Sequence, residues 1–303
     1  MEKKASFKDY FQLHAVIFIW GFTGILGKVI TISSVSIVWY RTLIAVVSLV
    51  LYMFLRKQPF NVNSKTLLKY FLIGLVIAIH WILFFEALKV STVSVTLTTL
   101  ASTTLFTSLL EPLFFRKKIV IYEILFGVII LIGLFLIFSF ETKYQLGIIY
   151  SLFSAVAAAL FTTVNGLFVG KGDSSIKITM YEMLGAVVFI TIYFISTGNL
   201  NLDTISLFNH GIETFWMDLS YLLILGIICT AIAFVVSVEV MKKLSPYTVS
   251  MSVNMEPIYA IGLALLFFGD SEKMSFGFYI GAGIIMLTIV GDGLMKQRLS
   301  KKQ

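Results

Sequence analysis

An acid and a proline stand together deep inside an apolar segment. Glu256 lies about nine residues into the run Tyr247–Phe268, which is roughly 14 Å at the helical rise per residue. Pro257 follows it, and a proline inside a helix removes a hydrogen bond and kinks the backbone. A carboxylate beside an interrupted backbone can ligate a cation, accept a proton or bind an amine. A hydrogen-bonded acid with a structural role is the alternative.

A histidine and three aromatic residues form a second group. His80 lies past the middle of the run Leu67–Leu88; Trp81 follows it, and Phe84 is one turn further on. Histidine titrates near neutral pH, so His80 could relay a proton or could simply be a satisfied interior residue. Trp20 lies away from the interface where membrane tryptophans concentrate, so it could line a cavity or pack in the core.

Further ionisable residues lie nearer the ends of the apolar runs. We hypothesise that they form an outer ionic gate (Lys28, Arg41, Glu86) and an inner one (Glu182 and Glu239 with the nearby Lys177, Lys242 and Lys243). Static ion pairs and snorkelling to the interface are the alternatives. Four more residues complete the candidate cavity set: Tyr40, Thr103, Tyr181 and Asn254. Polar side chains of this kind can line a path or hydrogen-bond between packed helices.

The composition determines which elements position these residues. The 303-residue chain is 58% hydrophobic and only 13% charged, whereas a soluble domain carries about 25% charged residues. A bilayer core requires a run of about 20 apolar residues for each helix. The runs here are continuous rather than alternating, which favours helices over a barrel. Ten runs fit: Phe11–Ile30, Val35–Leu55, Leu67–Leu88, Val93–Phe115, Ile119–Phe140, Tyr144–Val169, Ile178–Thr197, Leu219–Met241, Tyr247–Phe268 and Met274–Met295.

Basic residues predict the orientation of these spans. With the N-terminus inside, Lys89, Lys143 and Lys273 lie outside, and Lys28 and Arg41 lie within spans. The other 18 of the 23 basic residues then lie on the inner side. Both termini are therefore expected in the cytoplasm. Topology accounts for the net charge of +7, and no nucleic-acid partner is needed.

The sequence repeats itself. Tyr40-Arg41 aligns with Tyr181-Glu182 at an offset of 141, Phe22-Thr23 with Phe161-Thr162 at 139, and Glu86 with Glu239 at 153. At this last offset Thr103 aligns with Glu256, so the first half lacks a matching acid. We expect residues 1–140 and 141–303 to be two five-helix repeats. Because five is odd, the repeats must be inverted, an arrangement typical of transporters with a site at mid-membrane.

Four short motifs resemble those of one membrane family. They are Trp20-Gly21 with Lys28, Arg41 with Ala45, Phe84-Phe85-Glu86-Ala87-Leu88-Lys89, and Glu256-Pro257. Together they resemble the EamA-type members of the drug/metabolite transporter superfamily. The resemblance implies ten helices, cytoplasmic termini, a central cavity and alternating access. It also implies export of amino acids, other metabolites or drugs.

The sequence therefore predicts an all-α secondary transporter of small organic solutes. The alternatives are a non-transporting membrane scaffold or sensor and an intramembrane lipid-modifying enzyme, although no catalytic or metal-binding motif is found in the sequence. No cofactor is expected. Partners would be a small-molecule substrate, membrane lipid and coupling protons, with a monomer or homodimer in the inner membrane of a bacterium.

Overall fold

The chain folds into membrane-spanning helices. The computed structural model describes residues 5–197 and 212–300, and four lysines used for the orientation (Lys3, Lys4, Lys301, Lys302) lie outside them. Within the described residues nine helical segments are long and apolar enough to cross a membrane, and Phe276–Gly291 is a shorter apolar helix. The prediction of an all-α, multi-pass membrane protein is confirmed.

The first repeat begins with three uninterrupted helices. They are α1 (Phe7–Val29), α2 (Ser34–Leu55) and α3 (Ser64–Val90). The fourth span consists of two short helices, and the fifth is continuous: α4 (Val93–Leu100), α5 (Thr103–Phe115) and α6 (Ile121–Phe140). A 3₁₀ turn, Thr142–Tyr144, leads into the second repeat.

The second repeat has one long interrupted span and one broken span. Its first two helices are α7 (Gln145–Gly170) and α8 (Ser175–Ser196). The eighth span joins α10 (Ile212–Leu223), a π-helix (Ile224–Ile232) and α11 (Ala233–Val240). The rest comprises α12 (Pro246–Val253), α13 (Glu256–Phe268), the 3₁₀ turn Gly269–Glu272 and α14 (Phe276–Ser300).

The observed spans match the predicted runs within a few residues, except at the start of the eighth span. That span begins at Ile212 rather than Leu219, because the polar residues Glu213 and Asp218 do not prevent the first turns from being helical. Asp218 accepts hydrogen bonds from the backbone and hydroxyl of Thr31 at 3.2 and 2.6 Å. This contact joins the start of α10 to the connection between α1 and α2.

The fourth and ninth spans are broken at equivalent positions. The first break falls at Ala101 and Ser102, and the second at Asn254 and Met255, so both follow the offset of 153. At each break the backbone forms i→i−3 hydrogen bonds, such as Ser102 N to Thr99 O at 3.1 Å and Met255 N to Ser252 O at 3.0 Å. Pro257 explains the second break because it has no N–H to donate. The first break has no proline and was not predicted.

Both broken spans begin with a cap supplied partly by the opposite repeat. The hydroxyls of Thr92 and Ser245 accept hydrogen bonds from the first turns of α4 and α12. Glu272 also accepts from Ser94 N at 3.0 Å, and Glu111 accepts from Tyr247 N at 2.8 Å. Each repeat therefore fixes the start of the broken span of the other.

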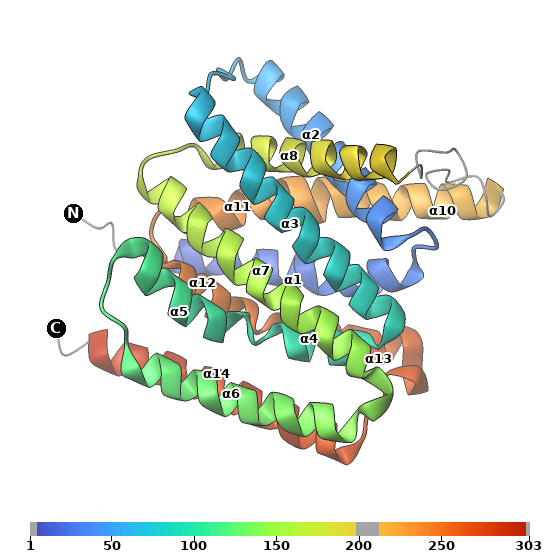
Figure 1. The fold of residues 1–303 in the computed structure, drawn as a ribbon, viewed down its shortest axis with the longest axis vertical. Helices are drawn as coiled ribbons and strands as arrows, with labels where there is room; N and C mark the ends of the chain where they lie inside the picture. The colour runs from blue at the N-terminus through green and yellow to red at the C-terminus, as the bar shows by residue number, and fades with distance from the viewer. Residues whose placement is uncertain (1–4, 198–211, 301–303) are drawn as a thin grey trace.

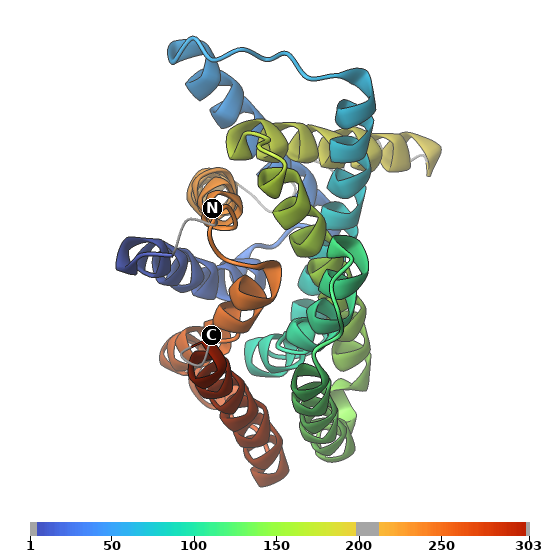
Figure 2. The ribbon, with the colours of Figure 1, turned by 90° about the vertical axis from the view of Figure 1, so that its left-hand side faces the viewer.

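The helices of the two repeats are intermixed in space. One bundle contains α3, α4, α7 and α8; in the other, α1 packs against the π-helix, α11 and α13, and α2 packs against both α8 and the π-helix. Figure 1 shows α3 and α7 side by side, and Figure 2 shows α1 (blue) on the opposite side of the molecule from α6 (green). α6 and α14 form a pair at one edge, where Gly133 and Gly281 allow close backbone contact. The two packing units are therefore not the two sequence repeats.

Candidate functional site

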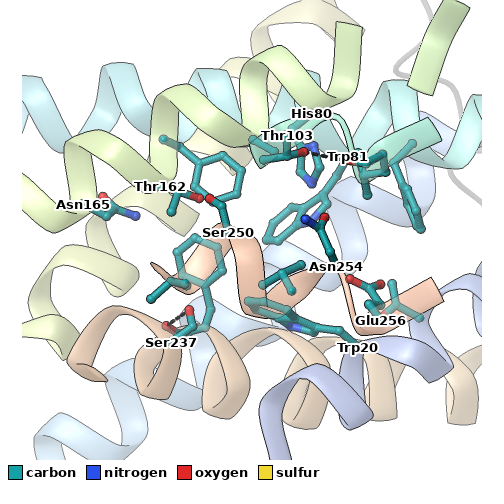
Figure 3. A pocket seen from close by; sticks show the side chains of 18 of the residues that line it. Trp20, His80, Trp81, Thr103, Thr162, Asn165, Ser237, Ser250, Asn254 and Glu256 are labelled. Atoms are coloured by element: carbon teal, nitrogen blue, oxygen red, sulfur yellow. Dashed lines mark hydrogen bonds between the residues drawn. The ribbon is translucent and has the colours of Figure 1, made fainter. Parts of the chain in front are cut away.

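A cavity lies between the two bundles. It contains about 930 Å³ of space free of protein atoms, its open mouth included, and side chains of α1, α2, α3, α4, α5, α7, α11, α12 and α13 line it. Figure 3 shows that residues from both bundles point into it, among them Trp20, His80 and Glu256. The cavity lining therefore comes from helices of both sequence repeats.

Equivalent positions of the two repeats line the same cavity. Because the lining contains both members of each pair, the repeat axis passes through the cavity. One pair has an offset of 139: Thr23 with Thr162. Six pairs have an offset of 153: Trp81 with Phe234, Phe84 with Ser237, Leu97 with Ser250, Leu100 with Val253, Ala101 with Asn254, and Thr103 with Glu256.

Arg41 is the one basic side chain among the residues that line this cavity. It is only 1% exposed, and its Nε and Nη2 donate to the hydroxyl of Thr230 at 3.0 and 2.8 Å. Its guanidinium lies 3.9 Å from the centre of the Trp81 ring, a cation–π contact. Nη1 has no hydrogen-bond partner. Arg41 can therefore offer one free charged donor to an anionic group in the cavity.

The π-helix positions both Arg41 and Trp20. In a π-helix the backbone bonds from i to i+5, and the Thr230 hydroxyl donates to the carbonyl five residues back, that of Leu225, at 2.7 Å. One residue earlier, the carbonyl of Cys229 accepts from the indole of Trp20 at 3.0 Å. The sequence contains no proline or glycine pattern that predicts this π-helix.

His80 and its aromatic neighbours form one wall. His80 Nδ1 lies 2.9 Å from the carbonyl of Ser154, which can only accept, so Nδ1 carries the hydrogen. The remaining nitrogen, Nε2, is then an acceptor. His80 stacks with Phe84 at 6.4 Å and lies 5.3 Å from the ring of Phe161.

Glu256 begins α13 at the second helix break. It is 7% exposed and lines the cavity, and its carboxylate forms no ion pair or hydrogen bond within the part of the chain described here. Next to it, the Asn254 amide donates to the hydroxyl of Thr104 across the cavity floor. The two helix breaks are thus hydrogen-bonded to each other, and Glu256 is left to face the cavity.

The predicted cavity set is divided by the structure. Trp20, His80, Phe84, Thr103, Asn254 and Glu256 line the cavity. Tyr40 and Tyr181 do not: Tyr40 packs against Trp39, and Tyr181 donates its hydroxyl to the Phe60 carbonyl at 2.5 Å. These two tyrosines are therefore not among the residues that line the cavity.

The predicted outer gate does not form as a group of ion pairs. Lys28 donates to the carbonyls of Leu88 and Ser91 at 2.9 and 2.6 Å rather than to an acid. Arg41 is in the cavity, and Glu86 forms no ion pair with either residue within the described part of the chain. Lysine-to-carbonyl hydrogen bonds connect α1 to the end of α3 instead.

On the inner side, one acid of the predicted group is paired with one of its lysines, and the other acid is not. Glu239 pairs with Lys242 at 2.7 Å, whereas Glu182 is fully buried in the bundle. Asp9, which the sequence did not indicate, pairs with Lys243 at 2.8 Å and connects the start of α1 to the start of the ninth span.

Several lining residues were not predicted, although the repeat contained a signal for some of them. Thr23 and Thr162 line the cavity and are part of the Phe-Thr match between the repeats. Phe161 precedes Thr162 and also lines it. Asn165 also lines the cavity.

Comparison with known proteins places this architecture among membrane transporters. Residues 9–139 and 145–291 each match the EamA-like transporter family, which confirms the internal repeat. One of 28 matching solved chains, titled "Crystal structure of protein", has a TM-score of 0.68 with 13% identity and covers 95% of this chain and 98% of that one. At this identity the likeness concerns the fold alone. No curated protein matches.

Proposed function

Because the chain belongs to the EamA-like transporter family, we propose that it is a secondary transporter that moves one small organic solute through the central cavity by alternating access. The supporting observation is that equivalent positions of the two repeats line this cavity. Inverted repeats with broken helices at mid-membrane have the geometry in which two bundles move around a fixed site.

The charges in the cavity favour a solute with an acidic and a basic group. Arg41 offers a free guanidinium nitrogen, and Glu256 offers a carboxylate without a partner. The aromatic rings of Trp20, Trp81 and Phe161 supply apolar walls between them. An amino acid or another zwitterionic metabolite satisfies both charges, whereas a neutral drug would leave them uncompensated.

The closing contacts are at the two ends of the cavity. On the outer side Gly27 lets α1 approach α3, because a Cβ there would lie 2.4 Å from the Phe85 ring. On the inner side the equivalent Gly166 lies against Pro246, where a Cβ would again come within 2.4 Å. We propose that these two glycine contacts alternately tighten and loosen as the bundles move.

The proposed direction is export from a bacterial cytoplasm, with both termini inside. Lys118 and Lys143 are exposed at opposite ends of α6 and therefore test the orientation. In a Cys229→Ala background, which has no other cysteine, a membrane-impermeant thiol reagent added to intact cells should label Lys143→Cys and not Lys118→Cys. The reverse labelling pattern would contradict this orientation.

The decisive experiment is a flux screen in proteoliposomes with pooled amino acids and small metabolites. Wild type is compared with Glu256→Gln and with Glu86→Gln, a partly exposed acid outside the cavity. We expect saturable flux of one solute class that Glu256→Gln abolishes and Glu86→Gln retains. Absence of flux from folded wild-type protein would favour a scaffold or sensor.

A further inference from the structure

A second buried acid lies beside the cavity rather than in it. Glu182 of α8 is 0% exposed and is about seven residues, or roughly 10 Å, from the inner end of its helix. Its Oε2 accepts one hydrogen bond, from the Asn165 amide at 3.2 Å, and its Oε1 has no partner. α3 contacts it closely on the other side, where Gly74 meets the Glu182 carbonyl.

Basic side chains of the surrounding region are engaged elsewhere. Lys177, on the same helix, donates to the Asn61 carbonyl at 3.0 Å. Lys242 and Lys243 pair with Glu239 and Asp9. No described lysine or arginine forms an ion pair with Glu182.

The other ionisable groups on the helices packed against α8 do not supply a positive charge to Glu182. Tyr70 of α3 and Asp173, just before α8, lie on its inner side, and Glu239 of α11 is bound by Ser175 and Lys242. On α2, Tyr40 is neutral and Arg41 is directed to Thr230. α7 contributes the uncharged Asn165.

An unpaired carboxylate in this position is costly. A charged side chain inside a membrane costs several kcal/mol unless it is paired or faces water. Under the proposed function, a zwitterionic solute in the cavity compensates the charges of Arg41 and Glu256. Glu182 has no such partner, and binding a proton at Oε1 removes its charge.

Asn165 connects this acid to the cavity. It lines the cavity and also donates to Glu182, and its own Oδ1 has no hydrogen-bond partner. When water fills the cavity, it approaches the Glu182 carboxyl group from the side on which Asn165 lies. Motion of α7 against the other bundle would then change whether Glu182 exchanges protons with water.

We infer that Glu182 is a proton-coupling site, separate from the solute site and connected to it through Asn165. The inference rests on the proposed transport function. With the cavity open outward, Oε1 takes a proton from water and forms an O–H bond. With the cavity open inward, that bond breaks, the proton passes to cytoplasmic water, and the next solute binds. One proton then enters for each solute that leaves.

The experiment separates exchange from gradient-driven transport in proteoliposomes that contain the solute found in the flux screen. Wild type should exchange labelled for unlabelled solute and should also accumulate it about tenfold for each pH unit and coupled proton. Glu182→Gln should keep exchange within about twofold of wild type but lose accumulation, because glutamine cannot release a proton. Glu182→Asp should restore accumulation, and Asp270→Asn, a change at an exposed acid away from the cavity and the gates, should keep both activities.

Each outcome decides between the two proposals. Accumulation by Glu182→Gln, or exchange by wild type without accumulation under a pH gradient, would overturn the coupling role and leave transport intact. Absence of exchange in wild type would overturn the transport function itself. If Glu182→Gln does not fold, proton release on addition of solute to purified wild type is measured with a pH indicator. Release of about one proton supports the inference, and no release overturns it.

Discussion

Replacing Arg41 by lysine keeps the positive charge but removes the geometry that we consider important. Arg41 donates from Nε and Nη2 to Thr230, and its Nη1 has no hydrogen-bond partner. A lysine ammonium is a single point on a flexible stem, so it can bind Thr230 or the solute but not both in the same geometry. The variant should therefore lose one charge-assisted hydrogen bond to the solute carboxylate.

The size of this loss follows from the strength of such a bond. A hydrogen bond to a charged group contributes about 1.5–3 kcal/mol. At about 1.4 kcal/mol per factor of ten, Arg41→Lys should raise KM roughly 10- to 150-fold. The maximal rate should change less, because the bond is expected in both the bound and the moving states.

The assay compares the solute with its primary amide, in which the carboxylate is replaced by a neutral group of similar size. Wild type should prefer the carboxylate, and Arg41→Lys should reduce that preference by most of the predicted factor. Initial rates of flux into proteoliposomes over a range of concentrations give both KM values. An equal rise in KM for both solutes would refute direct recognition of the carboxylate by Arg41.

Two further substitutions test the closing contact and the cap of a broken span. Gly27→Leu should prevent outer closure, because its Cβ would lie 2.4 Å from the Phe85 ring, whereas an ordinary contact is about 3.5–4.0 Å. Net flux should fall at least tenfold, while equilibrium binding of the solute persists. Normal flux in this variant would contradict the closing role. Glu272→Ala removes the acceptor for the first turn of α4 and should cost about 1 kcal/mol of stability. Thermal unfolding in detergent measures this, with the exposed Asp270→Ala as a control that should be neutral; equal melting temperatures would show that the cap adds nothing.

The sequence predicted the fold because the membrane imposes length. Spans of about 20 apolar residues, and the odd number of spans in each repeat, follow directly from the residue types. The break before Pro257 has a chemical cause that the sequence shows. The break at Ala101 and Ser102 is formed by 3₁₀ hydrogen bonds without a proline, so the alignment of Thr103 with Glu256 was its one sequence signal.

The sequence predicted how far along each helix the candidate site residues lie, but not which face of the helix they occupy. Distance along a helix places Trp20, His80 and Glu256 near mid-membrane, where the cavity is. Tyr40 and Tyr181 were misplaced because a helix that is apolar on all sides shows little difference between its interior and lipid faces. The gates failed for a related reason: Lys28 finds backbone carbonyls as partners, and every residue supplies a carbonyl.

The intermixing of the two repeats determines when the protein can fold during its synthesis. Arg41 emerges in the second span, yet its hydrogen-bond partner Thr230 is 189 residues further along the chain. Until the eighth span enters the membrane, Arg41 lacks this partner and is next to lipid, which is unfavourable for a charged side chain. The first five spans therefore form an incomplete intermediate: α2 gains its π-helix neighbour only with the eighth span, and α1 gains α13 only with the ninth.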